Sequence, residues 1–471
     1  MKNLLILFIA ATGLWVSSCY KDKGNYDYSI PEEPLISNID SVYSVQVGDS
    51  LIVSPVISFS DKSRLSYEWR ISVPERMVTQ KYTDPELRIV FGLLPKDYNV
   101  RLAVYDSANG MKYFRDFVIS GRTGLSVGST VLSNNEGVAT LSFIKPDGTV
   151  AQNLFEEVNG RPLRGEPLQV IPVIHQYVFN GLLLGYWVTT TDQSEGGVMI
   201  NPDTFEEIRT LKNNFFTPPA TVTTGYLRSS PNGVLEGVIN GHLYVGATQT
   251  YYGSEIYGYF GVPAEGDYQA FRKCPLNPSF PFYFGYEVNR KQFIGFTNFG
   301  SPAYVGTNYQ ALPGDGFDPL NVGLDLLNIE QVNAVEGYAM GKGSDGIVYE
   351  LKYNMGFIGL IQITPVYKRP FARQDLITAT TKWQVTPAQI FYFTSGDKIY
   401  RYNPLNESIV PLAADFGGNQ VSMIKIMDNG NTLIAGVEGS IYYLDTGVGK
   451  PGDIVKQING IPGQPVDITT R

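Results

Sequence analysis

The sequence predicts an all-β protein in two parts, a small β-sandwich followed by a longer array of repeated strands. The composition supports this prediction in three ways. Aromatic residues reach 13% of the chain, charged residues only 17%, and 49 Gly and 29 Pro supply many turns. No amphipathic pattern of helical length with capping residues occurs after residue 121, so we expect little helix there.

The N-terminal residues predict an export signal that ends in a lipid attachment site. A short positive start is followed by an apolar run over residues 4–16, which is shorter than the ~20 residues of a membrane-spanning helix. The run ends in Val16-Ser17-Ser18-Cys19, which resembles a lipobox, where a peptidase cuts before the cysteine and lipid is attached to its sulfur. Residues 1–18 are therefore predicted to be a signal peptide and Cys19 the lipidated residue. The alternative is an ordinary signal peptide with an incidental cysteine.

Residues 19–34 are polar and charged, which predicts a flexible tether behind the lipid. The second cysteine, Cys274, is expected to be a small buried hydrophobe, with a reactive thiol as the alternative. A net charge of −9 argues against nucleic acid or anionic lipid as a partner. We therefore expect the lipid anchor to be the only contact with a membrane.

Residues 35–121 contain six or seven short runs in which apolar and polar residues alternate, with turn residues between them. This number of strands predicts an immunoglobulin (Ig)-like sandwich. Tyr67-Glu68-Trp69 and the run over residues 98–110 resemble the polycystic-kidney-disease (PKD) type domain. The resemblance implies that Trp69 is buried, that Asp106 caps a turn and that Gly110 has a positive φ. Calcium binding by Asp106 is the weaker alternative.

Residues 122–471 predict a β-propeller. Three segments can be overlaid, residues 184–211, 390–412 and 432–458, and each reads as strand, Gly-bearing turn, strand and third strand. Repeats of ~40–50 residues with four strands each are typical of propeller blades. The length of this part corresponds to seven blades, with six or eight left open.

The ends of this part predict how the ring closes. Residues 130–133, 138–144 and 150–155 supply only three strands for the first blade. Residues 464–470 form an extra extended segment after the last complete blade. Because unpaired strand edges are a liability, we expect this segment to pair beside residues 130–133. A frayed tail is the alternative.

A second resemblance concerns the region where the two parts join. Residues 126–144 contain the pattern Leu-Ser-x-x-Glu-Gly-x-x-x-Leu-Ser-Phe-Ile, and residues 19–28 read CYKDKGNYDY. Together they resemble the PKD-like family of lipoproteins. The resemblance implies an accessory lipoprotein on the outer membrane, exposed at the cell surface of a Gram-negative bacterium. It further implies a Sus-type TonB-dependent importer with its lipoprotein lid as partners, and a surface peptidase as a third.

The sequence offers little catalytic chemistry. His175 and His242 are the only histidines and lie in different predicted blades, so both are expected to make ordinary hydrogen bonds. No zinc-binding spacing, nucleophile elbow or nucleotide-binding glycine loop occurs, and residues 313–318 are too short for a calcium loop. We therefore predict no catalytic residue, metal or cofactor. A carboxylate pair supplied by two blades stays open.

Aromatic density is the remaining feature. The runs over residues 251–260 and 280–286 hold more aromatic residues than alternating strands require. Packing between blades is one explanation. The other is a recognition surface for peptides or sugars, because Tyr combines a rigid apolar face with a hydroxyl group. Tyr251, Tyr252 and Tyr257 are the candidate binding residues, and Tyr251 and Tyr252 are the best candidates for an exposed pair.

Three functions fit this sequence. The first is a non-catalytic subunit of a nutrient-uptake complex that captures or presents oligopeptides or oligosaccharides. The second is a propeller hydrolase that uses a carboxylate pair, and the third is a scaffold that joins an importer to its peptidase. Since propellers serve all three purposes, the fold alone does not separate them.

Overall fold

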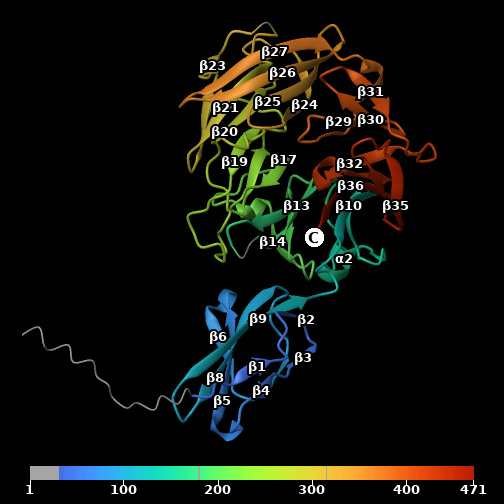
Figure 1. Ribbon diagram of the computed structural model, residues 1–471. Coiled ribbons are helices and arrows are strands. Elements are labelled where there is room, and N and C mark those ends of the chain that lie inside the picture. Colours follow the sequence, from blue (N-terminus) through green and yellow to red (C-terminus); the bar gives the residue numbers. More distant parts are fainter. Residues whose placement is uncertain (1–30, 179–180, 315) are drawn as a thin grey trace, which may run out of the picture. The chain divides into compact units, whose positions relative to one another are not determined.

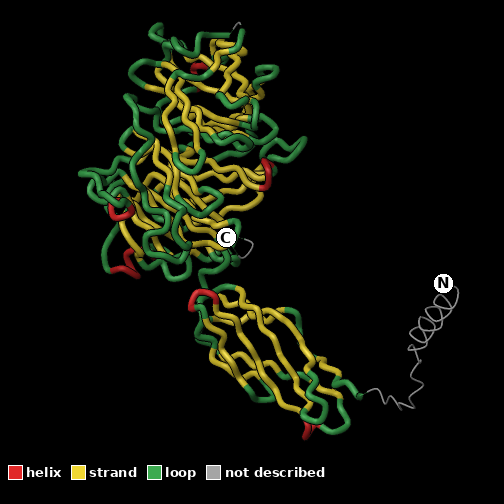
Figure 2. Tube along the Cα trace, turned by 90° about the vertical axis from the view of Figure 1, so that its left-hand side faces the viewer, coloured by secondary structure: helices red, strands yellow, loops and turns green. Residues whose placement is uncertain are grey.

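The computed structural model describes residues 31–178, 181–314 and 316–471. Cys19 and most of the predicted tether lie outside the described residues. The chain divides into two compact units, residues 1–121 (unit 1) and residues 122–471 (unit 2). Strands make up most of both units, with only short helical turns between them (Figure 2). These turns are η2 (Lys62–Arg64), η3 (Pro74–Arg76), α2 (Leu154–Asn159), η4 (Lys212–Asn214), η5 (Gln374–Leu376) and η6 (Asp428–Gly430).

Unit 1 is a β-sandwich built from a five-stranded sheet and two strand pairs. The five-stranded sheet has the order β2 (Val42–Gln46), β9 (Lys112–Arg122), β8 (Asp97–Asp106), β5 (Leu65–Val73) and β6 (Val78–Tyr82). The pairs are β1 (Leu35–Ser37) with β4 (Val56–Ser58), and β3 (Ser50–Val53) with β7 (Leu87–Val90). Alternate residues of these strands face a common core, which includes Leu51, Trp69 and Phe117. The predicted sandwich is confirmed.

The details implied by the PKD resemblance are present in unit 1. Trp69 is fully buried, and its indole Nε1 donates a hydrogen bond to the carbonyl of Asp84 at 2.8 Å. Asp106 caps its turn by accepting from the backbone N–H of Ala108 at 2.9 Å, and it also pairs with Arg64 at 2.6 Å. Gly110 has a φ of +72°, as the turn requires.

Unit 2 consists, over its described residues, of seven sheets that follow one another around a ring (Figure 1). We number them in order of their first strand. Sheet 1 contains β10 (Ser129–Asn135), β11 (Val138–Ile144), β12 (Val150–Ala151) and β36 (Gln464–Thr470); sheet 2 contains β13 (Pro167–His175), β14 (Leu182–Thr190), β15 (Gly197–Ile200) and β16 (Glu207–Thr210). Sheet 3 contains β17 (Thr224–Ser229), β18 (Leu235–Ile239) and β19 (His242–Val245); sheet 4 contains β20 (Phe282–Glu287), β21 (Gln292–Asn298) and β22 (Pro302–Gly306).

The remaining three sheets continue the ring in the same way. Sheet 5 contains β23 (Gln310–Ala311), β24 (Asp325–Gln331), β25 (Glu336–Lys342), β26 (Val348–Phe357) and β27 (Ile361–Pro370). Sheet 6 contains β28 (Trp383–Val385), β29 (Phe391–Ser395), β30 (Lys398–Asn403) and β31 (Ser408–Pro411). Sheet 7 contains β32 (Val421–Met427), β33 (Thr432–Val437), β34 (Ser440–Asp445) and β35 (Asp453–Asn459).

The core of unit 2 shows why these sheets form a ring. A separate apolar cluster lies between each sheet and the next, and one more lies between sheet 7 and sheet 1. Strands inside a sheet are therefore covered on both faces, and β18 and β20 are buried along their whole length. The predicted propeller architecture is confirmed.

The C-terminal strand closes the ring as predicted. β36 pairs antiparallel with β10, from Ser129 opposite Thr470 to Asn134 opposite Gln464 (Figure 1). Ile468 is buried in the cluster between sheets 7 and 1. The two ends of unit 2 are thus held in a single sheet, and the frayed-tail alternative is wrong.

One predicted strand differs from the structure. Residues 150–155 were expected to form a strand, but β12 ends at Ala151, and Leu154 begins the short helix α2. Asn153 has a left-handed backbone conformation, which ends the extended segment. The helix instead buries Leu154 and Phe155 in the cluster between sheets 1 and 2.

Candidate functional site

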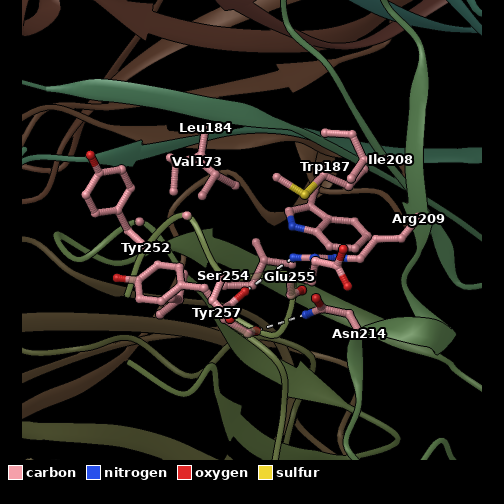
Figure 3. A pocket seen from close by; sticks show the side chains of 16 residues that line it. Val173, Leu184, Trp187, Ile208, Arg209, Asn214, Tyr252, Ser254, Glu255 and Tyr257 are labelled. Carbon is pink, nitrogen blue, oxygen red and sulfur yellow. Dashed lines mark hydrogen bonds between the residues drawn. The ribbon is translucent and has the colours of Figure 1, made fainter. Parts of the chain in front are cut away.

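A pocket of about 210 Å³ lies between sheets 2 and 3 of unit 2. Strands β13, β14 and β16 supply one wall, on which Val173, Leu184 and Trp187 stand (Figure 3). Residues 247–259, here called the aromatic loop, cover the opposite side. The loop is closed at its base because Ala247 N–H donates to Tyr259 and Gly258 N–H donates to Ala247, both at 2.9 Å. The aromatic run that the sequence singled out is therefore part of a pocket.

The three candidate tyrosines occupy different places around this pocket. Tyr252 is half-buried and lines it, as does Tyr257, which is only 7% exposed. The hydroxyl group of Tyr257 donates to the carbonyl of Asn232 at 2.5 Å, which fixes its ring. Tyr251 is 48% exposed and packs against Tyr252 with 4.3 Å between ring centroids, outside the pocket lining. Two of the three residues thus face a common cavity.

His175 joins this aromatic group from the end of β13. Its ring stacks on Tyr257 at 6.1 Å and meets the edges of Tyr252 and Tyr177 at 5.7 and 6.2 Å. The expectation of an ordinary hydrogen bond is met for His242, whose Nδ1 lies 3.0 Å from the carbonyl of Asn240. For His175, Nδ1 is buried without a hydrogen-bond partner among the described residues. The neighbouring aromatic rings pack around the imidazole.

Arg209 on β16 ties the aromatic loop to sheet 2. Its guanidinium group donates to the carbonyls of Glu255 at 2.8 Å and Tyr257 at 3.3 Å. It also lies 5.9 Å from the ring centroid of Trp187 and 5.0 Å from that of Tyr259. Burial lowers the pKa of Arg209, but a guanidinium group stays charged at neutral pH. The pocket therefore has a positively charged wall.

Asn214 supplies the most specific polar feature of the pocket. It ends the helical turn η4, is 1% exposed, and donates from Nδ2 to the carbonyl of Gly258 at 3.0 Å (Figure 3). A carbonyl oxygen only accepts hydrogen bonds, so the NH₂ end of the amide must face Gly258. The other end, Oδ1, is buried without a hydrogen-bond partner among the residues described. A buried acceptor without a partner costs free energy, which a donor from a bound water or ligand would recover.

The described residues place no pair of carboxylates at the pocket, and the buried acidic residues Glu236 and Glu350 lie outside its lining. Glu255 is the only carboxylate among the described residues that line it. Buried Glu236 accepts from Tyr283 at 2.6 Å, and buried Glu350 accepts from Tyr367 at 2.8 Å and from Arg369 at 3.1 Å. Burial raises the pKa of Glu350. Among residues 31–178, 181–314 and 316–471, no group of three or more His, Cys, Asp or Glu could hold a metal ion.

Two other features of the sequence have structural explanations. In the second aromatic run, residues 282–286 belong to the fully buried strand β20, so packing between sheets accounts for them. Cys274 is buried, and burial raises the pKa of its thiol, which confirms the expectation of a small hydrophobe. No helix in the part of the chain that the structure describes has the length and apolarity needed to span a membrane.

Sequence reasoning found the aromatic loop but missed its polar partners. Arg209 and Asn214 come from segments more than thirty residues before the loop, and nothing in their local pattern marks them. Trp187 lies in β14, where most of the neighbouring residues are also apolar, so the sequence does not single it out. Only the docking of the loop on sheet 2 brings these residues together.

Comparison with known proteins identifies the N-terminal part of the chain. Residues 19–167 match the model of the PKD-like family. This match confirms the resemblance seen in the sequence of this region. No curated protein sequence matches the chain.

Several solved structures match the chain at low similarity. A quinonprotein alcohol dehydrogenase-like protein from Bacteroides thetaiotaomicron is 10% identical, covers 93% of this chain and 99% of its own, and has a TM-score of 0.43. An auxiliary nutrient binding protein from the same organism is 10% identical over 86% of this chain and 95% of its own, with a TM-score of 0.29. A dihydro-heme d1 dehydrogenase is 10% identical over 79% of this chain and 72% of its own, with a TM-score of 0.39. Similarity at this level carries no information about function.

Proposed function

We propose that this chain is a non-catalytic binding protein of the bacterial cell surface that captures oligopeptides or oligosaccharides. The observation that carries the proposal is the pocket between sheets 2 and 3, where a buried acceptor on Asn214 has no partner within the described chain. Trp187, Tyr252 and Tyr257 line the same pocket. Such a combination of apolar surface and a few convergent polar groups is typical of ligand sites.

The chemistry of the pocket favours binding over hydrolysis. Carboxylate-based hydrolysis needs two acidic groups at about 5–9 Å from each other. The described pocket lining offers only Glu255, which is exposed and therefore lacks the burial that tunes a catalytic acid. The hydroxyl group of Tyr257 and the guanidinium group of Arg209 already bond to backbone carbonyls. These groups hold the pocket in shape and are not free to transfer protons.

The cellular setting is part of the same proposal. Lipid on Cys19 would anchor the protein in the outer membrane, with unit 2 outside the cell. The resemblance to PKD-like lipoproteins supports a Sus-type TonB-dependent importer and its lipoprotein lid as partners, and a surface peptidase as a third. Purification of the tagged protein from native membranes in mild detergent tests this: the importer and lid should co-purify in stoichiometric amounts, and their absence contradicts the partnership.

The binding function is tested by blocking the pocket. Ser254 lines the pocket from the aromatic loop, and Ser254→Trp places a large side chain at its entrance. Ser408→Trp on the exposed side of β31 is the matched control. The probes are a tryptic digest of serum albumin and short oligosaccharides of mannose and glucose, with bound species identified by mass spectrometry.

We expect the native protein and Ser408→Trp to retain members of one probe class, and Ser254→Trp to lose at least tenfold in affinity. Equal binding by all three proteins places the site elsewhere and contradicts the proposal. Failure of the native protein to bind either class also contradicts it. Release of cleaved probe with turnover would instead support the hydrolase.

A further inference from the structure

The size of the pocket limits what it can hold. Its volume is about 210 Å³. A cavity of about 150 Å³ is large enough to bind benzene. The pocket therefore accommodates one six-membered ring with a small substituent, which is smaller than a bicyclic indole and larger than a hydroxymethyl group.

The walls of the pocket favour an apolar ring over a sugar ring. Val173, Leu184, Met199 and Ile208 contribute aliphatic groups to one side. A monosaccharide carries several hydroxyl groups, and each one that faces an aliphatic wall loses its bonds to water without replacement. Arg209 covers one face of Trp187 and His175 covers one face of Tyr257, so less aromatic surface is left to stack on a sugar.

The polar groups define the substituent. Oδ1 of Asn214 is an acceptor without a partner, so the ligand must present a hydrogen-bond donor beside its ring. The positive charge of Arg209 opposes a cationic ligand. An uncharged aromatic ring with one donor satisfies both conditions.

We infer that the pocket receives the side chain of a tyrosine from a peptide ligand, with its phenol O–H donating to Oδ1 of Asn214. Among the protein side chains, the phenol group of tyrosine combines a single six-membered ring with a hydrogen-bond donor. This inference rests on the proposed function and selects oligopeptides over oligosaccharides. The site would then select peptides by one residue, the tyrosine whose side chain enters the pocket.

The test compares three ligands on the full-length protein by isothermal titration calorimetry. N-acetyl-tyrosinamide carries the phenol donor, N-acetyl-phenylalaninamide lacks it, and N-acetyl-O-methyl-tyrosinamide keeps the oxygen without the proton. We expect the tyrosine amide to bind about tenfold more tightly than either of the others. Asn214→Leu should reduce its affinity to that of the phenylalanine amide while leaving the latter unchanged within about twofold.

The ligand comparison uses the native protein, and the thermal unfolding of Asn214→Leu is measured to establish that the variant is folded. Equal affinities of the three amides for the native protein overturn the inference but leave the proposed function standing if Ser254→Trp abolishes binding. Tighter binding of mannose or glucose oligosaccharides than of the tyrosine amide also overturns it. If Ser254→Trp changes no binding at all, both the inference and the proposed function fail.

Discussion

Asp467 links the strand that closes the ring of unit 2 to both neighbouring sheets. It lies in β36, and its Oδ1 accepts from the ammonium group of Lys425 in sheet 7 at 2.7 Å. Its Oδ2 accepts from the backbone N–H of Val170 in sheet 2 at 3.0 Å. One carboxylate in sheet 1 thus binds both neighbouring sheets, and only 16% of its side chain is exposed. Asp467→Ala removes both bonds between sheets and leaves the Val170 N–H without its partner; it also removes the bond that Oδ1 accepts from the Ile468 N–H at 2.9 Å.

The size of the effect follows from these two bonds. A hydrogen bond to a charged group contributes about 1.5–3 kcal/mol, and the value for the pair with Lys425 is reduced because that lysine is partly exposed. We therefore expect the free energy of unfolding of unit 2 to fall by about 3 kcal/mol. With an unfolding entropy of about 2.1 cal/mol/K per residue, unit 2 loses about 4 °C in Tm.

Differential scanning calorimetry of the full chain measures this change. Asp453→Ala, at an exposed position in the outermost strand β35 of sheet 7, is the matched control and should melt within about 1 °C of the native protein. Asp467→Asn keeps an acceptor for Val170 but loses the charge, so we expect roughly half the effect. If Asp467→Ala melts like Asp453→Ala, the reasoning about ring closure is refuted.

Three further predictions concern other parts of the chain. Cys19→Ala should move the protein from the membrane fraction to the soluble fraction, as measured by immunoblotting; acylation at another residue contradicts the anchor. Deletion of residues 464–471 removes a ladder of six residue pairs and buried Ile468, so calorimetry should show no cooperative transition for unit 2; an unchanged transition contradicts the closure. Asp106→Ala breaks the fully buried end of the pair with Arg64 and the cap of its turn, a loss of about 2–3 kcal/mol that should lower the Tm of unit 1 by about 10 °C; a shift below 2 °C contradicts the cap.

The repeating parts of the fold were predictable from the sequence, because they depend on local patterns. The burial of Trp69 and the positive φ of Gly110 were implied by the resemblance of two short sequence runs to the PKD type domain. Pairing of β36 with β10 was predictable because the first blade had only three predicted strands and residues 464–470 were left over after the last blade. Helix α2 was missed because a left-handed residue at Asn153 turned an apolar pair away from the strand.

The polar part of the candidate site was not predictable in the same way. Oδ1 of Asn214 is a candidate ligand contact only because the carbonyl of Gly258 uses the other end of the amide. That relation depends on how the aromatic loop folds back over sheet 2. His175 was expected to be an ordinary polar residue, since its contacts with Tyr252 and Tyr257 arise from the same folding of the loop. Aromatic density indicated where to look but not which atoms would be left without partners.

Trp187 allows the central claim, that the pocket between sheets 2 and 3 binds a ligand, to be measured directly. It lines the pocket and is nearly buried, so a ligand that enters should change its fluorescence emission. The measurement is a fluorescence titration of the full-length protein and of Trp187→Phe with the peptides retained from the albumin digest. We predict a saturable change in the native protein that is lost in Trp187→Phe, although Trp15, Trp69 and Trp383 remain. Binding of the same peptides, shown by calorimetry, without any change that depends on Trp187 would contradict the claim.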